Sequence, residues 1–241
     1  MCGRFVLEAT WKELHDAFDL VRTNDPPEIA PRYNIAPTQP VLVVRPAFGD
    51  VSKGREATFA RWGLMPSWVR DPADFPTLIN ARGETAHEKP SFRAAMRHRR
   101  VLVPASGFYE WKANGKGRPK QPYYITPRDG GVVTFGGLME HWSGPDGDEI
   151  PSAAIVTTGP NGTFGALHDR MPYVVPPDRR DAWMDVANVT AKDASEMLVP
   201  PDEAFWQARP VGRRVGNPRV DDPHLIDPIA PDEVEGDPVE L

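Results

Sequence analysis

Runs of apolar and β-branched residues recur along most of the chain, and turns rich in Gly, Pro, Asp and Lys separate them. Turns such as "KANGKGRPK" and "SGPDGDE" are typical of antiparallel hairpins, so the runs predict strands. The predicted strands cover residues 41–44, 57–64, 101–104, 107–111, 122–126, 132–138 and 153–158.

Helical spacing of apolar positions interrupts these strands. In "TWKELHDAFDL", Thr10 and Glu13 form a capping box, which predicts a short helix. Its apolar face consists of Trp11, Leu14 and Phe18. Because helices and strands do not alternate regularly, the pattern favours an α+β fold over a doubly wound sheet. Further helices are predicted at residues 91–99, 178–186 and 191–198.

Two stretches lack both kinds of periodicity. Residues 22–40 hold five prolines, which predicts an ordered loop or extended segment rather than a Gly/Ser linker. The last stretch, "PDEVEGDPVEL", is acidic and poor in apolar residues, so it is predicted to be disordered. No internal repeat and no clear boundary divides the rest, which indicates a single domain.

Composition narrows the class of protein. One cysteine among 241 residues excludes an internal disulfide framework and a cysteine-rich zinc site. No apolar run approaches the ~20 residues of a membrane span, and the N-terminus lacks the layout of a signal peptide. We therefore expect a cytoplasmic protein with no membrane partner.

The charge distribution decides whether nucleic acid is a plausible partner. The net charge of -6 argues against it at first. From Gly216 onward, however, the chain carries eight acidic residues and one basic residue, Arg219. Removing this net -7 leaves the preceding 215 residues at about +1. A local basic groove is therefore compatible with the composition.

The only cysteine is the second residue, in "MCGRF". One interpretation is a small hydrophobic residue near a poorly ordered terminus. The other is a nucleophile, because methionine is normally removed before a small residue. Cys2 would then carry a thiol and a free α-amine, whose ordinary pKa is about 8. The amine condenses with an aldehyde to an imine, and the adjacent thiolate closes on it to a thiazolidine.

Two further stretches combine polar and rigid residues. In "LINARGET", Asn80 and Arg82 are two residues apart, so an extended strand points both to one side. That arrangement offers a neutral hydrogen-bonding group together with a cation suited to phosphate. In "ASGFYEW", Glu110 is either a solvent-facing strand carboxylate or a group desolvated by its aromatic neighbours, which suits a proton shuttle.

A third stretch, "ALHDRMP", holds His168. This histidine is either a structural loop residue or an acid–base group. Its neighbours Asp169 and Arg170, placed before a Met-Pro turn, favour a polar site. Histidine exchanges protons near neutral pH, which acid–base chemistry requires. Each of these signals is weak when taken alone.

Together, the motifs resemble those of a known family. "MCGRF", "RYNIAPTQ", "RWGLMPSW", "INARGET", "VPASGFYEW" and "ALHDRMP" are similar to the motifs of the SRAP (SOS response-associated peptidase) family, also called abasic-site processing proteins. The later "VGNPRVDDPHLIDPI" resembles that family's closing segment. The resemblance covers residues 2–229 in the same order, and it leaves residues 230–241 as an acidic tail.

The resemblance implies a single α+β domain with a mainly antiparallel, barrel-like β core, short flanking helices and a positively charged groove. It implies recognition of abasic sites in single-stranded DNA during the SOS or DNA damage response. It also implies covalent capture as a thiazolidine DNA–protein crosslink through Cys2, after removal of Met1. The catalytic residues carried over are Cys2, Asn80, Glu110 and His168. The residues expected to contact DNA are Arg4, Asn34, Pro37, Trp68, Arg82 and Arg170.

Aldehyde capture requires no metal and no cofactor, and none is expected. The partner expected is single-stranded DNA with an abasic site, bound by a monomer that associates with the nucleoid. Two alternatives stay open. One is a cysteine-type peptidase, a hydrolase or lyase-like enzyme, since cysteine, histidine and asparagine form a plausible acyl-transfer set. The other is a noncovalent reader of single-stranded DNA.

Overall fold

The computed structural model describes residues 2–21, 28–236 and 239, and its strands and helices are short. The strands are β1 (Phe5–Leu7), β2 (Arg32–Ile35), β3 (Pro40–Pro46), β4 (Arg55–Trp62), β5 (Asn80–Arg82), β6 (Arg100–Ala105), β7 (Gly107–Lys112), β8 (Gln121–Pro127), β9 (Val133–Ser143), β10 (Glu149–Thr158), β11 (Met171–Pro172) and β12 (Trp206–Pro210). The α-helices are α1 (Trp11–Phe18), α2 (Gly83–Ala86), α3 (Arg93–His98), α4 (Arg180–Met184) and α5 (Ala191–Glu196).

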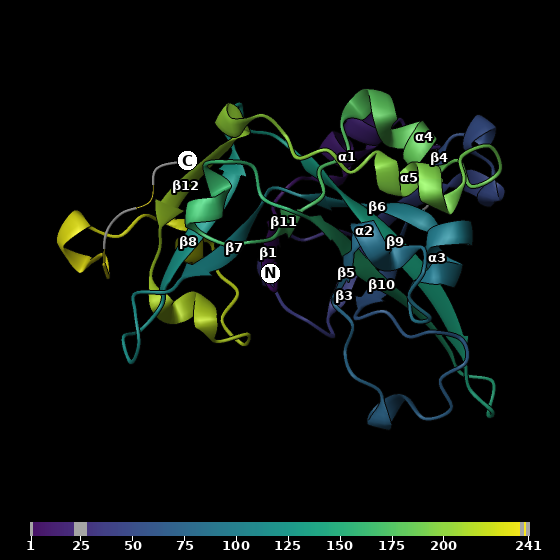
Figure 1. Cartoon of the computed structure of the whole chain (residues 1–241), viewed down its shortest axis with the longest axis horizontal. Coiled ribbons are helices and arrows are strands. Elements are labelled where there is room, and N and C mark those ends of the chain that lie inside the picture. Colours follow the sequence, from purple (N-terminus) through teal and green to yellow (C-terminus); the bar gives the residue numbers. More distant parts are fainter. Residues whose placement is uncertain (1, 22–27, 237–238, 240–241) are drawn as a thin grey trace.

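One sheet closes into a barrel. Its strands pair in the order β10-β4-β3-β6-β9, and β9 pairs with β10 to complete the ring. All these pairings are antiparallel except β10 with β4, which is parallel. Strands β5 and β11 add to the end of β10 that leads to Thr158. The short helices α2, α3 and α4 pack on the outside of this barrel (Figure 1).

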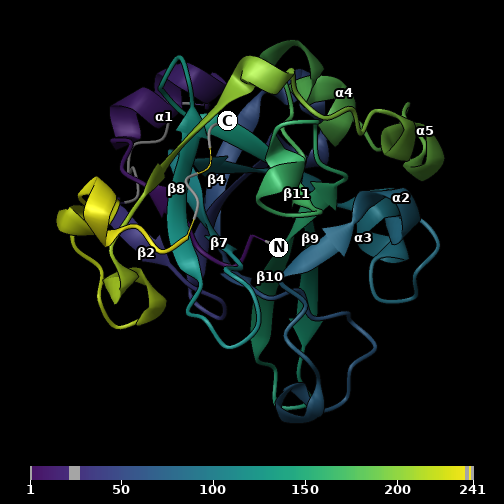
Figure 2. The same ribbon diagram turned by 60° about the vertical axis from the view of Figure 1, so that its left-hand side comes forward.

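A second sheet, in the order β12-β8-β7-β1-β2, is antiparallel throughout. The two sheets share one continuous stretch of chain, because β6 of the barrel leads through Ser106 into β7 of the second sheet. Figure 1 shows β1 in the middle of the molecule, with β7 and β8 on one side and the barrel on the other, and Figure 2 likewise shows the described N-terminal end in the middle. The segment before β1 therefore starts where the two sheets meet.

Aromatic side chains fill the space between the sheets. Phe5 of β1 meets Trp62 of β4 edge to face, with ring centroids 5.2 Å apart. Phe108 of β7 contacts Phe135 of β9 at 5.9 Å and Trp206 of β12 at 5.3 Å. All five are buried in one hydrophobic core. This continuous core fixes the second sheet against the barrel and so holds any site at their junction rigid.

The α+β fold with a mainly antiparallel, barrel-like core is confirmed. Every predicted strand lies in the structure, as β3, β4 and β6 to β10. The capping box at Thr10 starts α1, whose buried residues are Leu14 and Phe18. The helix predicted at 178–186 is divided, since a 3-10 turn at Pro177–Arg179 precedes α4.

The proline-rich segment is described from residue 28 onward, and β2 lies within it. Its residues 22–27, like Met1, lie outside the described residues. Among the residues that the structure describes, no helix combines the length and the apolar character needed to cross a membrane.

The acidic tail, predicted to be disordered, is described at residues 230–236 and at Val239. A 3-10 turn covers Pro231–Glu233. The backbone N–H of Glu235 donates to Oε1 of Gln121 at 3.0 Å. The N–H of Val239 donates to the hydroxyl of Tyr123 at 3.2 Å, and the Val239 side chain is buried. Within the described residues the tail thus contacts β8 at Gln121 and Tyr123.

Candidate active site

Strand β1 positions Cys2 beside Glu110. Phe5 is paired with Phe108 on β7, and the N–H of Tyr109 donates to the carbonyl of Arg4 at 2.9 Å. Extending this antiparallel register by two residues from Phe5 sets Gly3, the residue after Cys2, opposite Glu110. Both side chains are buried, Cys2 completely and Glu110 with 5% of its surface exposed.

This environment disfavours the thiolate of Cys2. Burial raises the pKa of the thiol well above its ordinary value, and the negative charge of Glu110 raises it further. The sulfur makes one weak contact, to the carbonyl of Arg4 at 3.8 Å. The thiol therefore stays protonated at neutral pH, and a reaction at sulfur requires a group that accepts its proton.

Asn80 fixes the backbone of Cys2 from the barrel side. β5 pairs in parallel with β10, with Asn80 next to Ile155. The Nδ2 of Asn80 donates to the carbonyl oxygen of Cys2 at 2.8 Å. Within the described part of the chain, the buried Oδ1 of the same amide accepts no hydrogen bond. A buried acceptor without a donor is costly, so this oxygen is suited to a donor that a ligand or an α-amine supplies.

His168 lies in the loop that leads into β11. Thr157 of β10 is flanked by Arg82 of β5 and by Pro172 of β11, so this loop runs beside the end of β5. The Nδ1 of His168 lies 3.0 Å from the N–H of Arg170 and 2.8 Å from Oδ1 of Asp169. Nδ1 can donate to the carboxylate or accept from the N–H, and the position of its proton decides which.

Arg170, predicted to contact DNA, is bound to other residues of the fold in this structure. Its guanidinium makes a two-pronged ion pair with Glu84, at 2.7 and 2.8 Å, and also donates to Thr157. Burial opposes the ionisation of Glu84, but the hydrogen bonds from Arg170 and from the backbone, together with the charge of Arg170, outweigh it and lower the pKa of that carboxyl. With 13% of its side chain exposed, Arg170 joins the His168 loop to α2, which follows the strand of Asn80.

Replacing Arg170 by alanine is expected to slow chemistry at the site more than it weakens binding of a strand. The His168 loop loses its attachment to α2, and misplacement by about 1 Å can cost about a hundredfold in rate. Glu84→Gln should produce a similar defect, since it breaks the same ion pair. Reaction time courses and strand titrations of both variants test this. A loss of strand affinity in the Arg170 variant alone would show direct DNA contact instead.

Arg4 and Asn34 form a buried junction with the C-terminal segment. The Arg4 guanidinium donates to Oδ1 of Asn34 at 2.9 Å and to the carbonyl of Val215 at 2.7 Å. Burial lowers the pKa of Arg4. The Asn34 amide donates to the carbonyls of Val215, Asn217 and Val220. Its side chain has no exposed surface, and these hydrogen bonds occupy it within the fold.

Three predicted DNA contacts do lie at the surface. Trp68 is 58% exposed and meets Phe75 edge to face, with centroids 5.6 Å apart. Arg82 is exposed at the end of β5, and no carboxylate of the described residues forms an ion pair with it. Pro37 is half-buried in the turn between β2 and β3. These residues can reach a ligand without breaking an existing contact.

The structure brings Cys2, Asn80 and Glu110 together and sets the His168 loop beside the strand of Asn80. Sequence reasoning missed Glu84, although it stands in "INARGET", because its partner lies 86 residues away. It also missed Asp221, whose carboxylate accepts from the N–H groups of Tyr33 and Asn34. The chain itself offers no signal for such distant pairs.

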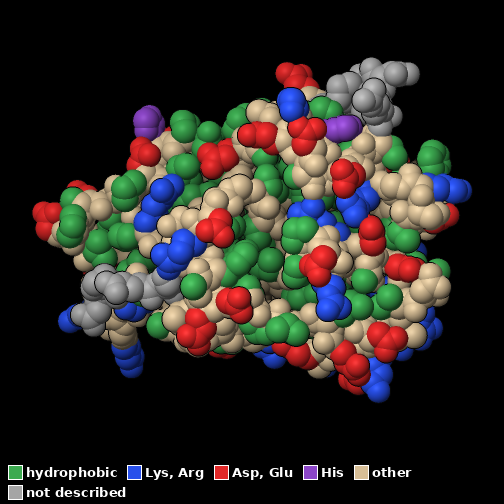
Figure 3. All heavy atoms as spheres, turned by 90° about the horizontal axis from the view of Figure 1, so that it is seen from above, with side chains coloured by type: hydrophobic (Ala, Val, Ile, Leu, Met, Phe, Trp, Pro, Cys, Tyr) green, Lys and Arg blue, Asp and Glu red, His purple; other side chains and the backbone are tan. Residues whose placement is uncertain are grey.

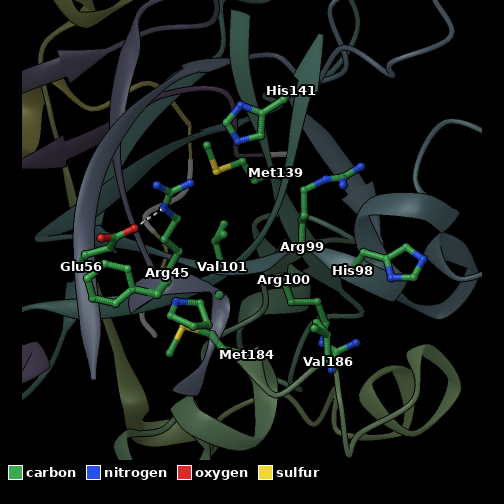
Figure 4. A pocket seen from close by; sticks show the side chains of 13 residues that line it. Arg45, Glu56, His98, Arg99, Arg100, Val101, Met139, His141, Met184 and Val186 are labelled. Carbon is green, nitrogen blue, oxygen red and sulfur yellow. Dashed lines mark hydrogen bonds and ion pairs between the residues drawn. The ribbon is translucent and has the colours of Figure 1, made fainter. Parts of the chain in front are cut away.

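A cavity of about 320 Å³ lies elsewhere on the barrel and contains none of the predicted site residues. Arginines, histidines and methionines line it, and Glu56 pairs there with Arg45 at 2.8 Å (Figure 4). No group of three or more His, Cys, Asp or Glu residues able to hold a metal occurs among the described residues.

The arrangement is a buried thiol on the second residue, at a sheet junction, with its backbone carbonyl bound by Asn80 and the carboxylate of Glu110 nearby. The family model described as "SOS response associated peptidase (SRAP)" matches residues 1–218, so the chain belongs to the SRAP family.

Several relatives bear the name "abasic site processing protein". YoaM of Bacillus subtilis is 35% identical over 219 residues, covering 91% of this chain and 94% of YoaM. YedK of Escherichia coli is 34% identical, covering 90% and 95%. A solved structure from Bacteroides thetaiotaomicron shares the fold with a TM-score of 0.82 at 22% identity, covering 95% of this chain and 100% of that one.

Proposed function

We propose that this protein recognises abasic sites in single-stranded DNA and captures them as a thiazolidine crosslink through Cys2, after removal of Met1. The names of its relatives support an abasic-site substrate. The observation that carries the covalent step is the placement of Cys2. Asn80 holds its carbonyl at 2.8 Å, and its thiol lies close enough to Glu110 for the two charges to interact.

Covalent capture forms two new bonds to one carbon, C1 of the abasic sugar. The neutral α-amine of Cys2 attacks the C1 aldehyde of the open-chain sugar, and the carbonyl oxygen leaves as water, which gives an imine. The sulfur then adds to the imine carbon, and the thiol proton ends on the nitrogen of the thiazolidine. Since both nucleophiles belong to one residue, ring closure is effectively intramolecular. Asn80 limits the positions that this residue can adopt.

Proton transfers are assigned to Glu110 and His168. The closed form of an abasic sugar opens only when a proton moves at its ring oxygen and hydroxyl, and Glu110 serves this step. His168 moves protons at C1 while the imine forms and when it reverts. The free Oδ1 of Asn80 accepts from the α-amine or from a sugar hydroxyl, which satisfies the buried oxygen.

The DNA strand is held by cations and aromatic faces. Arg82 and Trp68 are exposed and available for phosphate and base. Arg4 is proposed as a second phosphate contact. Asn34 acts on the strand through Arg4, because it binds that guanidinium and the carbonyls around it.

Trp68→Ala is expected to weaken strand binding about tenfold or more, with or without a lesion. Stacking of one base contributes roughly 1–3 kcal/mol, and the indole is open to solvent. Fluorescence anisotropy with an undamaged oligonucleotide measures this loss. Phe48→Ala is the matched control, since Phe48 is 83% exposed but lines the cavity in Figure 4. Equal losses in both variants would rule out a specific stack on Trp68.

The test of the function is incubation with matched oligonucleotides, with and without an abasic site, followed by denaturing electrophoresis. A heat-stable adduct with only the abasic strand supports the proposal. Binding without an adduct supports a noncovalent reader, and cleavage of a peptide substrate without an adduct supports a peptidase. Intact mass measurement, done in parallel, must show that Met1 is absent from the reactive protein.

A further inference from the structure

Three arginines lie on the two segments that meet at Arg4, namely β2 and the stretch that leads to Val215. The Arg4 guanidinium binds the carbonyls of Val215 and Gly216, so the residues just before them, Arg213 and Arg214, are anchored beside it. Arg32 lies on β2, which pairs with β1. All three side chains are partly exposed, at 33% for Arg32, 53% for Arg213 and 63% for Arg214. Such a group is suited to several phosphates of one strand.

Each of these arginines is paired with an acidic residue of the C-terminal segment. Arg32 pairs with Asp221 at 2.5 Å, Arg214 with Asp222 at 2.7 Å, and Arg213 with Glu235 at 2.5 Å. The match to the SRAP model ends at residue 218, so the arginines lie inside it and all three carboxylates lie beyond it. Figure 3 shows one face of the molecule, on which basic and acidic side chains are interspersed.

The three carboxylates are not equivalent. Asp221 also accepts from the backbone of Tyr33 and Asn34, and Asp222 accepts from the N–H of His224. Both are therefore part of the local fold. The side chain of Glu235 makes one contact with the described residues, its ion pair with Arg213. Its segment is held on β8 by two backbone hydrogen bonds and by the Val239 side chain.

We propose that Arg213, with Arg32 and Arg214, forms a phosphate-binding surface that the acidic C-terminal segment neutralises, and that a bound strand displaces Glu235 from Arg213. This rests on the proposed binding of single-stranded DNA. An exposed ion pair contributes little to stability, so a phosphate can replace the carboxylate at small cost. The tail then limits the affinity for undamaged strands. A protein that searches DNA for lesions must dissociate from such strands.

The salt dependence of binding separates this exchange from ordinary binding. A phosphate that reaches an unpaired arginine releases counterions, and each such contact on a single strand adds about 0.7 to the slope of log K against log salt. When a phosphate displaces Glu235, Arg213 exchanges one anionic partner for another. Glu235→Gln is therefore expected to steepen this slope by about 0.7 and to tighten binding at low salt about two- to fivefold.

Asp232→Asn is the matched control. It removes the same charge from the same tail, and within the described residues Asp232 makes no ion pair. Arg213→Ala should weaken binding less in the otherwise unchanged protein, where Glu235 already occupies the guanidinium, than in the Glu235→Gln background, where it should cancel the gain. Anisotropy titrations of full-length variants between about 50 and 200 mM salt measure all of these effects.

Equal effects of Glu235→Gln and Asp232→Asn would overturn the proposal. A loss from Arg213→Ala that is as large with Glu235 as without it would also overturn it, since Arg213 would then be free to bind already. Crosslinking of an abasic strand is measured on the same samples. If the unchanged protein binds and crosslinks the strand, and the Glu235 and Arg213 variants bind as it does, only the proposal of a neutralised phosphate-binding surface is wrong. If it neither binds nor crosslinks, the proposed function fails and this proposal with it.

Discussion

Cys2→Ala is expected to abolish the heat-stable adduct with an abasic strand. Without sulfur the thiazolidine ring cannot close, and only the reversible imine remains. Alanine is small enough for Met1 to be removed, so the variant keeps a free α-amine. Borohydride, which reduces an imine to a stable amine, should therefore trap part of the complex, while the untreated sample shows no adduct. Denaturing electrophoresis with and without reductant measures both results.

The control for this experiment is binding of an undamaged strand, which Cys2→Ala should leave unchanged because the side chain is fully buried. Intact mass must confirm removal of Met1 from the variant as well. An undiminished adduct without reductant would exclude a thiazolidine and would direct attention to the amine alone.

Glu110→Gln is expected to slow capture by about 10²–10⁴-fold, the range of general acid–base catalysis. Glutamine keeps the shape of the side chain and its hydrogen bonding but exchanges no proton. The same substitution removes a negative charge beside the thiol, which lowers the pKa of Cys2 and increases the thiolate fraction at a given pH. The two consequences therefore have opposite signs for the rate.

Single-turnover time courses at several pH values show whether the lost proton transfer or the increased thiolate fraction dominates the rate. If ring opening by Glu110 limits the rate, the variant is slower at every pH. If ionisation of the thiol limits it, the variant is faster, and its rate levels off at lower pH than that of the unchanged protein. Glu149→Gln, at the exposed start of β10, controls for the loss of one negative charge. A variant that matches the unchanged protein at every pH would remove Glu110 from the mechanism.

The residue pattern within single segments was enough to predict the barrel strands and the first helix. The strands of the barrel follow from apolar runs, and α1 follows from Thr10 and Glu13. The inference that Asn80 and Arg82 share an extended strand is confirmed by β5. β1, with three residues, was not predicted, because so short a segment forms a strand only through its partners β2 and β7.

The candidate site, like the fold, could be predicted only in part. The sequence placed Cys2, Asn80 and Glu110 in separate motifs, and the resemblance supplied the expectation that they meet. The partners that the side chains bind within the fold could not be predicted from the sequence. Arg170 and Asn34 are polar residues in strong motifs, yet Glu84 and the C-terminal carbonyls occupy them at separations of 86 and 181 residues. These partners within the fold were not predicted by the motifs.

The junction at Arg4 has a consequence for how the protein is made. Its hydrogen bond to Val215 joins residues that are 211 positions apart, and Asn34 reaches the same segment. The ribosome releases the N-terminus first, and domains complete their packing only as later segments emerge. Cys2 is therefore synthesised first, whereas β7 and then the C-terminal segment, which enclose and anchor its strand, follow later. Until both have emerged the thiol is not enclosed, and under the proposed mechanism a small aldehyde that reaches it competes with DNA for the same nucleophile.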